Sequence, residues 1–147
     1  MSENQAPANP HSFSSRITVR FGDTDPAGLV YYPVLFHYCH VAMEEFFAAR
    51  CGVAYAQLVA RERVGFPTVN VQARFCAPLV YGDEVEVAVA VTRVGRSSAT
   101  FEYELRRAGD QALCARATLV QVAMNLDTRR AVEIPAGLRH AFAAAAP

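Results

Sequence analysis

One long apolar segment, followed by little except strand patterns, limits how this chain can fold. Residues 33–50, PVLFHYCHVAMEEFFAAR, have the length and composition of a helix, and Pro33 suits its first position because the missing N–H has no partner there anyway. Cys51-Gly52 supplies the stop. Such a helix is roughly 27 Å long. Because it is apolar on most sides, we expect other elements to wrap it.

The rest of the chain consists of strand patterns separated by turns. Residues 85–94, VEVAVAVTRV, alternate a row of valines with small or polar residues, which predicts a strand with one face toward a core. Short turns between consecutive strands favour an antiparallel meander whose concave face the helix fills, an α+β fold. A shorter helix is predicted at about 54–62, and the predicted strands cover residues 16–21, 68–77, 84–94, 98–107, 112–126 and 131–134.

At 147 residues the chain fits one domain. We assign the domain to residues 16–140, a disordered polar tail to 1–15, and a flexible end to 141–147, AFAAAAP. No signal peptide is visible at the N-terminus, and charged residues interrupt the apolar stretches before they could span a membrane. We therefore expect a cytoplasmic protein.

Formal net charge is zero, so no electrostatic footprint for nucleic acid or for an anionic membrane is present. The cysteines lie within apolar periodic segments of a chain without an export signal. Free buried thiols are therefore predicted rather than disulfides at Cys39, Cys51, Cys76 and Cys114.

The loop ahead of the long helix carries the most distinctive chemistry. Asp25 precedes Pro-Ala-Gly, a turn that brings its carboxylate near the first helical turn, whose N–H groups lack acceptors. Because Pro33 has no N–H, the backbone of Tyr32 is the nearest donor that could polarise a carbonyl oxygen. A carboxylate beside an oxyanion donor is the minimum equipment for acyl transfer. The alternative is that Asp23 or Asp25 merely caps a turn, worth about 0.5–1 kcal/mol.

The run FGDTDPAGLVYYP, the apolar helix with its Cys-Gly stop, the later GFPT and the late EIP resemble the 4-hydroxybenzoyl-CoA thioesterase family of the hotdog fold. The resemblance extends from about residue 16 to residue 134. It implies an antiparallel sheet wrapped around one long helix, paired subunits with active sites at the dimer interface, and dimers that assemble into tetramers. It implies no cofactor.

Carried over residue by residue, this resemblance places the catalytic carboxylate on Asp25 and the carbonyl-polarising amide on Tyr32. Asp25 would attack the thioester carbonyl or activate a water that does so, and the sequence leaves both open. Asp23 would order the loop, and Gly28 would allow close backbone approach to the thioester.

Two positions depart from the family pattern. Where the 4-hydroxybenzoyl enzyme has an aspartate that meets the ring hydroxyl, this chain has His40, about 10 Å along the helix from Pro33. His40 could meet the distal edge of an aromatic acyl group, or it could simply pair with Glu44 at i,i+4. A related branch acting on short-chain acyl groups has histidine where Tyr32 stands, so the tyrosine favours an aroyl substrate.

Other candidate contacts for substrate lie later in the sequence. By analogy with the family, Gly65, Phe66 and Thr68 would line the acyl pocket, although Phe66 could equally belong to the core. Tyr31 is a further candidate contact, and it too could belong to the core. The CoA phosphates suit Arg93, Arg96 and Ser97 at a turn, although turns are commonly basic for solubility alone.

Two rival sites use the long helix itself. His37, His40 and Glu44 share one face, which would suit a metal site of two histidines and one carboxylate, but nothing else in the chain supplies the surrounding groups that would orient such ligands, so we expect no metal. Cys39 and His40 are neighbours and point about 100° apart, which disfavours a cysteine nucleophile with a histidine base.

The sequence therefore predicts a cofactor-independent acyl-CoA thioesterase acting on a benzoyl-type thioester in aromatic compound catabolism. Its partners would be the acyl-CoA and further copies of the chain in a homotetramer. The alternatives are a short-chain aliphatic acyl-CoA thioesterase, a hotdog hydratase or dehydratase, and a non-catalytic acyl-CoA-binding domain.

Overall fold

The computed structural model describes residues 13–147. Its helical segments are a 3₁₀ turn η1 (Phe21–Asp23), the long helix α1 (Tyr32–Arg50), the short helix α2 (Tyr55–Gln57), a π turn η2 (Leu58–Glu62) and α3 (Ala136–Ala144). Its strands are β1 (Phe13–Thr18), β2 (Val64–Gly65), β3 (Thr68–Phe75), β4 (Glu84–Val94), β5 (Ser98–Arg107), β6 (Leu113–Val122), β7 (Met124–Asn125) and β8 (Arg130–Ala131).

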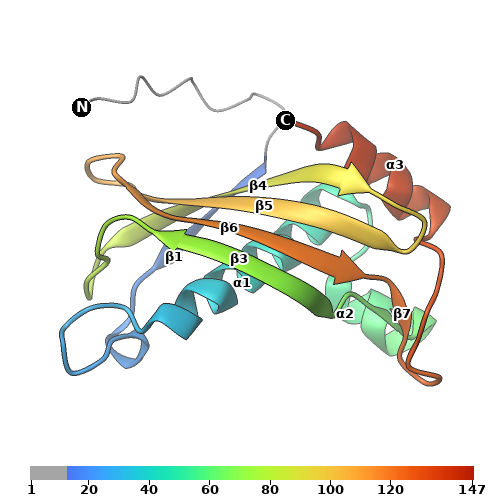
Figure 1. Cartoon of the computed structure of the whole chain (residues 1–147), viewed down its shortest axis with the longest axis horizontal. Coiled ribbons are helices and arrows are strands. Elements are labelled where there is room, and N and C mark those ends of the chain that lie inside the picture. The colour runs from blue at the N-terminus through green and yellow to red at the C-terminus, as the bar shows by residue number, and fades with distance from the viewer. Residues whose placement is uncertain (1–12) are drawn as a thin grey trace.

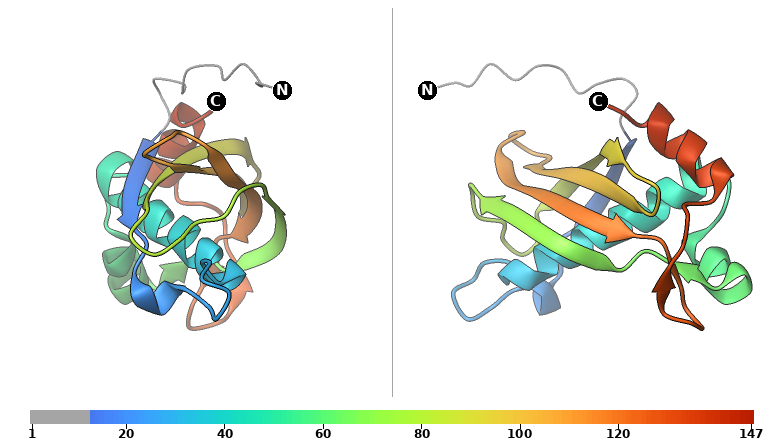
Figure 2. Two further views of the ribbon diagram at one scale, coloured as in Figure 1. Left: turned by 90° about the vertical axis from the view of Figure 1, so that its left-hand side faces the viewer. Right: turned by 45° about the vertical axis from the view of Figure 1, so that its right-hand side comes forward.

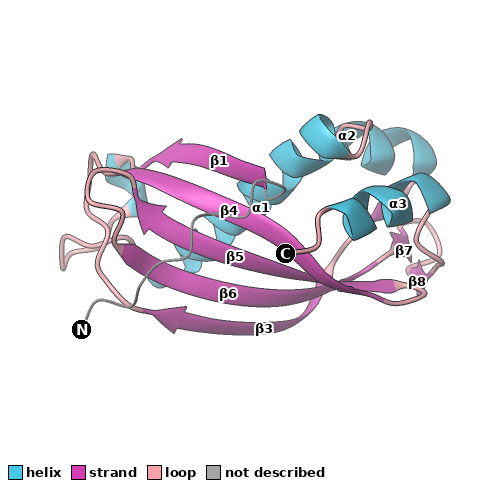
Figure 3. Cartoon of the chain, turned by 90° about the horizontal axis from the view of Figure 1, so that it is seen from above, coloured by secondary structure: helices cyan, strands magenta, loops and turns pink. Residues whose placement is uncertain are grey.

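A five-stranded antiparallel sheet in the order β1-β4-β5-β6-β3 forms the body of the molecule. It curves over α1, as Figures 1 and 2 show. A small three-stranded sheet, β2-β7-β8, lies with α2 and α3 at one end (Figure 3). This is the predicted α+β hotdog arrangement of a sheet wrapped around one long helix.

The valine face of β4 is turned toward the core, as its alternating sequence predicts. Val85, Val87, Val89 and Val91 are at most 2% exposed and face α1, while the residues between them are only partly covered. On α1 the fully buried side chains recur at helical spacing and meet this row: Leu35, Tyr38, Cys39, Ala42, Met43, Phe46 and Phe47. Gly52 follows α1 with a φ of +70°, a conformation that glycine adopts without strain, so the predicted stop is confirmed.

The end of the chain differs from the flexible segment predicted over residues 141–147. It continues α3, and the ring of Phe142 is completely buried against Phe46, Phe47 and Phe101. The carbonyl of Ala145 also accepts a hydrogen bond from the N–H of Val91. An alanine-rich sequence looks weakly anchored by itself, but one large aromatic side chain fixes this helix to the core.

The start of the domain also differs from the prediction. Strand β1 begins at Phe13, inside the predicted tail of residues 1–15, and ends at Thr18 instead of residue 21. Its register with β4 buries Ser15, whose hydroxyl donates to the Glu45 carboxylate on α1. The rest of the predicted tail, residues 1–12, lies outside the described residues.

Two later predictions of strands need correction. The strand predicted over 112–126 is divided at Ala123, because the chain passes there from the large sheet into the small one, and only Arg130–Ala131 of the last segment pairs as a strand.

All four cysteines have free thiols; Cys39 and Cys114 are buried, Cys51 is half-buried, and Cys76 is exposed, contrary to the expectation of burial. Within residues 13–147, no helix has both the length and the apolarity needed to cross a membrane.

Candidate active site at the mouth of the long helix

Residues 23–32, here called the helix mouth, are held in place by Asp23. Its Oδ2 accepts hydrogen bonds from the Arg20 N–H at 3.0 Å and from the Tyr38 hydroxyl at 2.6 Å, and its carbonyl accepts one from the Tyr31 N–H at 2.9 Å. Burial, reinforced by the hydrogen bond to Asp23, raises the pKa of Tyr38, so its hydroxyl remains a donor. The predicted loop-ordering role of Asp23 is confirmed.

Asp25 begins a tight turn within this loop. Its Oδ1 accepts the Ala27 N–H at 2.9 Å, and its carbonyl accepts the Gly28 N–H at 2.9 Å. Gly28 has a φ of +82°, and a side chain there would meet nothing within 4 Å. Glycine is thus needed for the backbone conformation, and the space beside it is open. Of the two carboxylate oxygens of Asp25, only Oδ1 receives a hydrogen bond from residues 13–147. Oδ2 is therefore able to accept a proton or to attack a carbonyl.

Tyr32 is the first residue of α1, and its amide is a free donor of the mouth. The Tyr31 and Val34 N–H groups bond to backbone carbonyls, and Pro33 has none to offer. Within residues 13–147 the Tyr32 N–H has no acceptor, as expected for a first-turn amide. This position of α1 also carries the positive end of the helix dipole. The sequence placed Pro33 first in the helix; the structure shifts the start by one residue.

A cavity of about 430 Å³ lies against the Tyr32 side of the mouth. Its lining is mainly apolar: Leu29, Val30, Tyr32, Leu35, Phe75, Cys76, Ala77, Pro78 and Leu79. The Phe75 ring packs edge-on against the Tyr32 ring with centroids 6.2 Å apart. Tyr31, half exposed, packs against Tyr32 in the same way. Asp25 does not line the cavity but is joined to its wall, because the Asp25 N–H donates to the Leu29 carbonyl.

The other predicted contacts lie at the opposite end of the molecule. Phe75 marks the mouth end of β3. Thr68 begins that strand, and Gly65 and Phe66 come just before it, roughly 25 Å from Phe75 for eight residues in extended conformation. Arg93, Arg96 and Ser97 lie at this same far end, in and beside the turn between β4 and β5. One chain therefore does not bring all the predicted residues together (Figure 1).

His40 belongs to the far group. Its Nε2 lies 3.4 Å from the Glu44 carboxylate, so the i,i+4 pairing weighed from the sequence exists. Its ring also packs edge-on against Tyr55, with centroids 5.7 Å apart. The imidazole is only half buried, so these two contacts leave part of it accessible.

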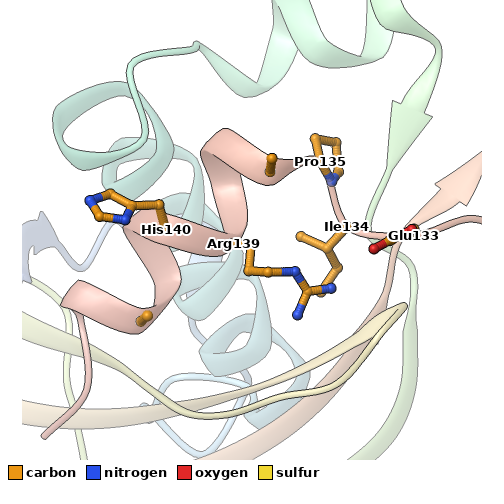
Figure 4. Close-up of a pocket in the computed structure, with 7 residues that line it drawn as sticks. Glu133, Ile134, Pro135, Arg139 and His140 are labelled. Atoms are coloured by element: carbon orange, nitrogen blue, oxygen red, sulfur yellow. The ribbon is translucent and has the colours of Figure 1, made fainter.

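The far end carries an arginine that the sequence interpretation passed over. Arg139 of α3 donates from Nη2 to the Arg96 carbonyl at 2.9 Å, which brings its guanidinium beside the predicted CoA-binding turn. Figure 4 shows Arg139 directed toward Ile134, in an open cavity of about 730 Å³ that also contains Glu133 and His140. Because this segment reads as a fraying end, only its docking on the core reveals the proximity.

The rival sites on α1 find little support. Among residues 13–147 no group of three or more His, Cys, Asp or Glu side chains is placed to hold a metal ion. Cys39 is 1% exposed, and burial raises the pKa of its thiol to about 12, so it is not a thiolate at neutral pH.

Comparison with known proteins decides the class. The profile of the thioesterase-like superfamily matches residues 19–142, which cover the mouth, the long helix and every strand of the sheet except β1. The chain belongs to this superfamily. It is thus a thioester hydrolase of the hotdog fold.

Individual relatives of this thioesterase act on aromatic thioesters. A 1,4-dihydroxy-2-naphthoyl-CoA hydrolase of Thermosynechococcus vestitus is 34% identical over 118 residues, covering 80% of each chain. The crystal structure of a 1,4-dihydroxy-2-naphthoyl-CoA thioesterase from Synechocystis superposes with a TM-score of 0.81 at 26% identity, covering 90% of this chain and 96% of that one. A gentisyl-coenzyme A thioesterase gives a TM-score of 0.78 at 29% identity, covering 87% and 98%.

Proposed function

We propose that the protein hydrolyses the thioester of an aromatic acyl-CoA, releasing the free acid and CoA. The observation that carries the proposal is the Tyr32 N–H at the positive end of α1, which has no acceptor among residues 13–147 and belongs to a residue that lines an apolar cavity beside the loop of Asp25. A thioester carbonyl bound there would accept this hydrogen bond, which strengthens as negative charge develops on its oxygen. The Asp25 carboxylate would attack the carbonyl carbon or remove a proton from the attacking water.

A second copy of the chain would complete this site. β3 is an edge strand with all eight residues exposed. Val71 lies opposite buried Leu119 in the β3–β6 pair, so its side chain is on the core face of the sheet. It is nevertheless 46% exposed, and Phe75 of the same strand is 50% exposed. Such an apolar edge is normally covered. Antiparallel pairing of two β3 strands would set the mouth of one chain beside Gly65, Phe66 and Thr68 of the other.

The same pairing would carry the basic end of one chain toward the mouth of its partner. Arg93 and Arg96 are exposed there, and Ser97 is half exposed. Guanidinium groups suit the phosphates of CoA, and all 14 basic side chains of this protein are arginines. Assembly of such dimers into tetramers stays a prediction.

The aromatic preference is supported by the substrates in the relatives' names, naphthoyl-CoA and gentisyl-CoA. It is also supported by the tyrosine at position 32 and by the half-exposed His40, which could meet a ring hydroxyl. Because the relatives are named for different aromatic acyl groups, we widen the benzoyl-type substrate predicted from the sequence to aromatic acyl-CoA thioesters in general. We include the bicyclic 1,4-dihydroxy-2-naphthoyl group beside benzoyl and 4-hydroxybenzoyl.

The test is a panel of CoA thioesters, with a thiol reagent that detects released CoA. We expect kcat/KM to be highest for the aroyl thioesters and lower for acetyl-, butyryl- and palmitoyl-CoA. Faster turnover of butyryl-CoA than of every aroyl thioester would overturn the aromatic preference and favour the short-chain alternative. Tight binding without turnover of any thioester would favour the non-catalytic alternative.

A further inference from the structure

The segment that joins β2 to β3 leaves one sheet and enters the other. β2 pairs with β7 in the small sheet, whereas β3 pairs with β6 in the large one. Between them stand Phe66 and Pro67, which belong to neither strand. Pro67 has no N–H to donate, so regular ladder bonds cannot hold this crossover.

Two side chains replace the missing ladder bonds. The Phe66 N–H donates to the Tyr55 hydroxyl at 2.9 Å, and the Phe66 carbonyl accepts the side-chain amide of Gln121 at 2.9 Å. One backbone bond follows, from the Val122 N–H to the Pro67 carbonyl at 3.0 Å. The peptide groups on both sides of Phe66 are therefore fixed by Tyr55 from one direction and by Gln121 from the other.

Gln121 is an unexpected residue for stability alone. It is 2% exposed, and its Oε1 has no hydrogen-bond partner among residues 13–147. A buried acceptor without a partner costs about 1–3 kcal/mol, which offsets much of what the single bond to Phe66 contributes. An apolar side chain of equal length would remove that cost but would leave the Phe66 carbonyl without its side-chain donor. What Gln121 adds is therefore a fixed position for the Phe66 carbonyl rather than a clear gain in stability.

Tyr55 connects the crossover to α1. Its ring packs edge-on against His40, with centroids 5.7 Å apart, and against Phe47, with centroids 5.4 Å apart. The same side chain therefore touches the residue expected to meet the distal edge of the acyl group and holds the segment expected to line it.

We propose that Tyr55 and Gln121 are positioning residues that determine acyl selectivity by fixing the Phe66–Pro67 crossover. The proposal rests on the proposed function, since residues 65–68 would form the acyl-pocket wall of the partner's site. Neither side chain needs to touch the substrate. A pocket wall must be held within about 0.5 Å to select between acyl groups, and a displacement of about 1 Å can cost up to 10²-fold. Loss of either bond would release the wall.

Tyr55→Phe and Gln121→Met test the proposal, because each keeps side-chain size and removes one bond to Phe66. Tyr103→Phe is the matched control: Tyr103 is 1% exposed and its hydroxyl has no hydrogen-bond partner among residues 13–147, so this change removes a buried hydroxyl without breaking a bond seen there. The measurement is the ratio of kcat/KM for benzoyl-CoA to that for butyryl-CoA, together with the melting temperature.

We expect the selectivity ratio to fall about 10-fold in both variants and to stay within twofold of wild type in the control. A purely structural role would lower the melting temperature and leave the ratio unchanged. Wild-type selectivity in both variants, whatever their stability, overturns the proposal. Tyr55→Phe keeps the test decisive if Gln121→Met does not fold.

Binding separates this proposal from the proposed hydrolysis. S-phenacyl-CoA and S-acetonyl-CoA are thioethers that cannot be hydrolysed, and the ratio of their Kd values reports acyl selectivity without turnover. If the wild type binds them selectively but hydrolyses no thioester, and both variants lose the selectivity, the hydrolysis fails and the positioning role stands. If the wild type hydrolyses benzoyl-CoA and the variants keep both ratios, the positioning role fails and the hydrolysis stands.

Discussion

The two ends of the molecule differ in how they are ordered and in what they offer. At the helix mouth, backbone amides and the Asp23 carboxylate fix a tight loop, and the groups that can react are the Asp25 carboxylate and the Tyr32 N–H, which has no acceptor among residues 13–147. At the far end, side chains of Tyr55 and Gln121 hold a crossover, and the exposed chemistry is guanidinium groups. The first end can polarise and attack a carbonyl; the second can hold an acyl group and phosphates.

Neither end by itself has all the groups that the proposed reaction needs. A long strand, β3, separates the two ends, and its core face lacks a cover at Val71 and Phe75. In one chain the reacting groups and the binding groups are therefore far apart. Two chains paired through β3 would bring opposite ends together, so each of the following experiments addresses one end or the strand between them.

The largest effect is expected at the mouth. Asp25→Asn removes the nucleophile or base while keeping the size of the side chain, so kcat should fall by about 10²- to 10⁴-fold with folding intact. Glu102→Gln is the control, because it makes the same change on an exposed strand position. Turnover of benzoyl-CoA, measured beside a circular dichroism spectrum, gives the answer; a wild-type rate in Asp25→Asn rejects the assignment.

The second-largest effect is expected from a charge on β3, the strand between the two ends. Val71→Lys puts a charge on the uncovered core face of β3, so we expect a monomer and a loss of kcat/KM of about 10²-fold. Gln72→Lys places the same charge on the same strand but on the opposite face, and should leave the assembly unchanged. Sedimentation velocity measures the mass. An active Val71→Lys monomer would show that one chain contains the whole site.

A smaller effect is expected at the basic end. The double variant Arg93→Ala, Arg96→Ala should raise KM for benzoyl-CoA about 10-fold and change kcat little, because phosphates are bound equally in the ground and transition states. Benzoyl-N-acetylcysteamine has no nucleotide, so its KM should not change. Arg16→Ala, on the opposite edge of the sheet, is the control. Equal KM changes for both thioesters would mean that these arginines do not bind the CoA phosphates.

The smallest effect is expected from Tyr38→Phe, which removes the hydrogen bond to Asp23 beneath the mouth. Because the acceptor is a carboxylate, the free energy of unfolding should fall by about 1–2 kcal/mol, with kcat changed only a few-fold. Folding raises the pKa of Tyr38 above its ordinary value of 10.0. The stabilisation is therefore complete below about pH 10 and is lost as the pH rises further.

Urea unfolding of both proteins at neutral pH and above pH 10 tests this. The difference between wild type and Tyr38→Phe should be largest at neutral pH and should shrink in alkali. A difference that grows with pH would contradict the direction of the shift.

The main elements and the chemistry of the mouth could be predicted from the amino-acid sequence alone. The apolar helix, the valine alternation of β4 and the Asp-Pro-Ala-Gly turn are local patterns, and local patterns fix local structure because burial and backbone sterics act over a few residues. The bounds of β4 and β5 follow directly from alternation and turn residues. Asp23, Asp25 and Tyr32 lie within ten residues, so their proximity needed no knowledge of the fold.

Features that depend on contacts between distant residues became visible in the folded chain. Phe142 anchors an alanine-rich end that looks flexible as a sequence, Arg139 reaches the carbonyl of Arg96, and Gln121 reaches the carbonyl of Phe66. No periodicity encodes these contacts, because each joins segments that the sheet brings together after folding. The separation of the predicted site residues between two ends is likewise a property of the long strand, and it became visible only when that strand had a place in the sheet.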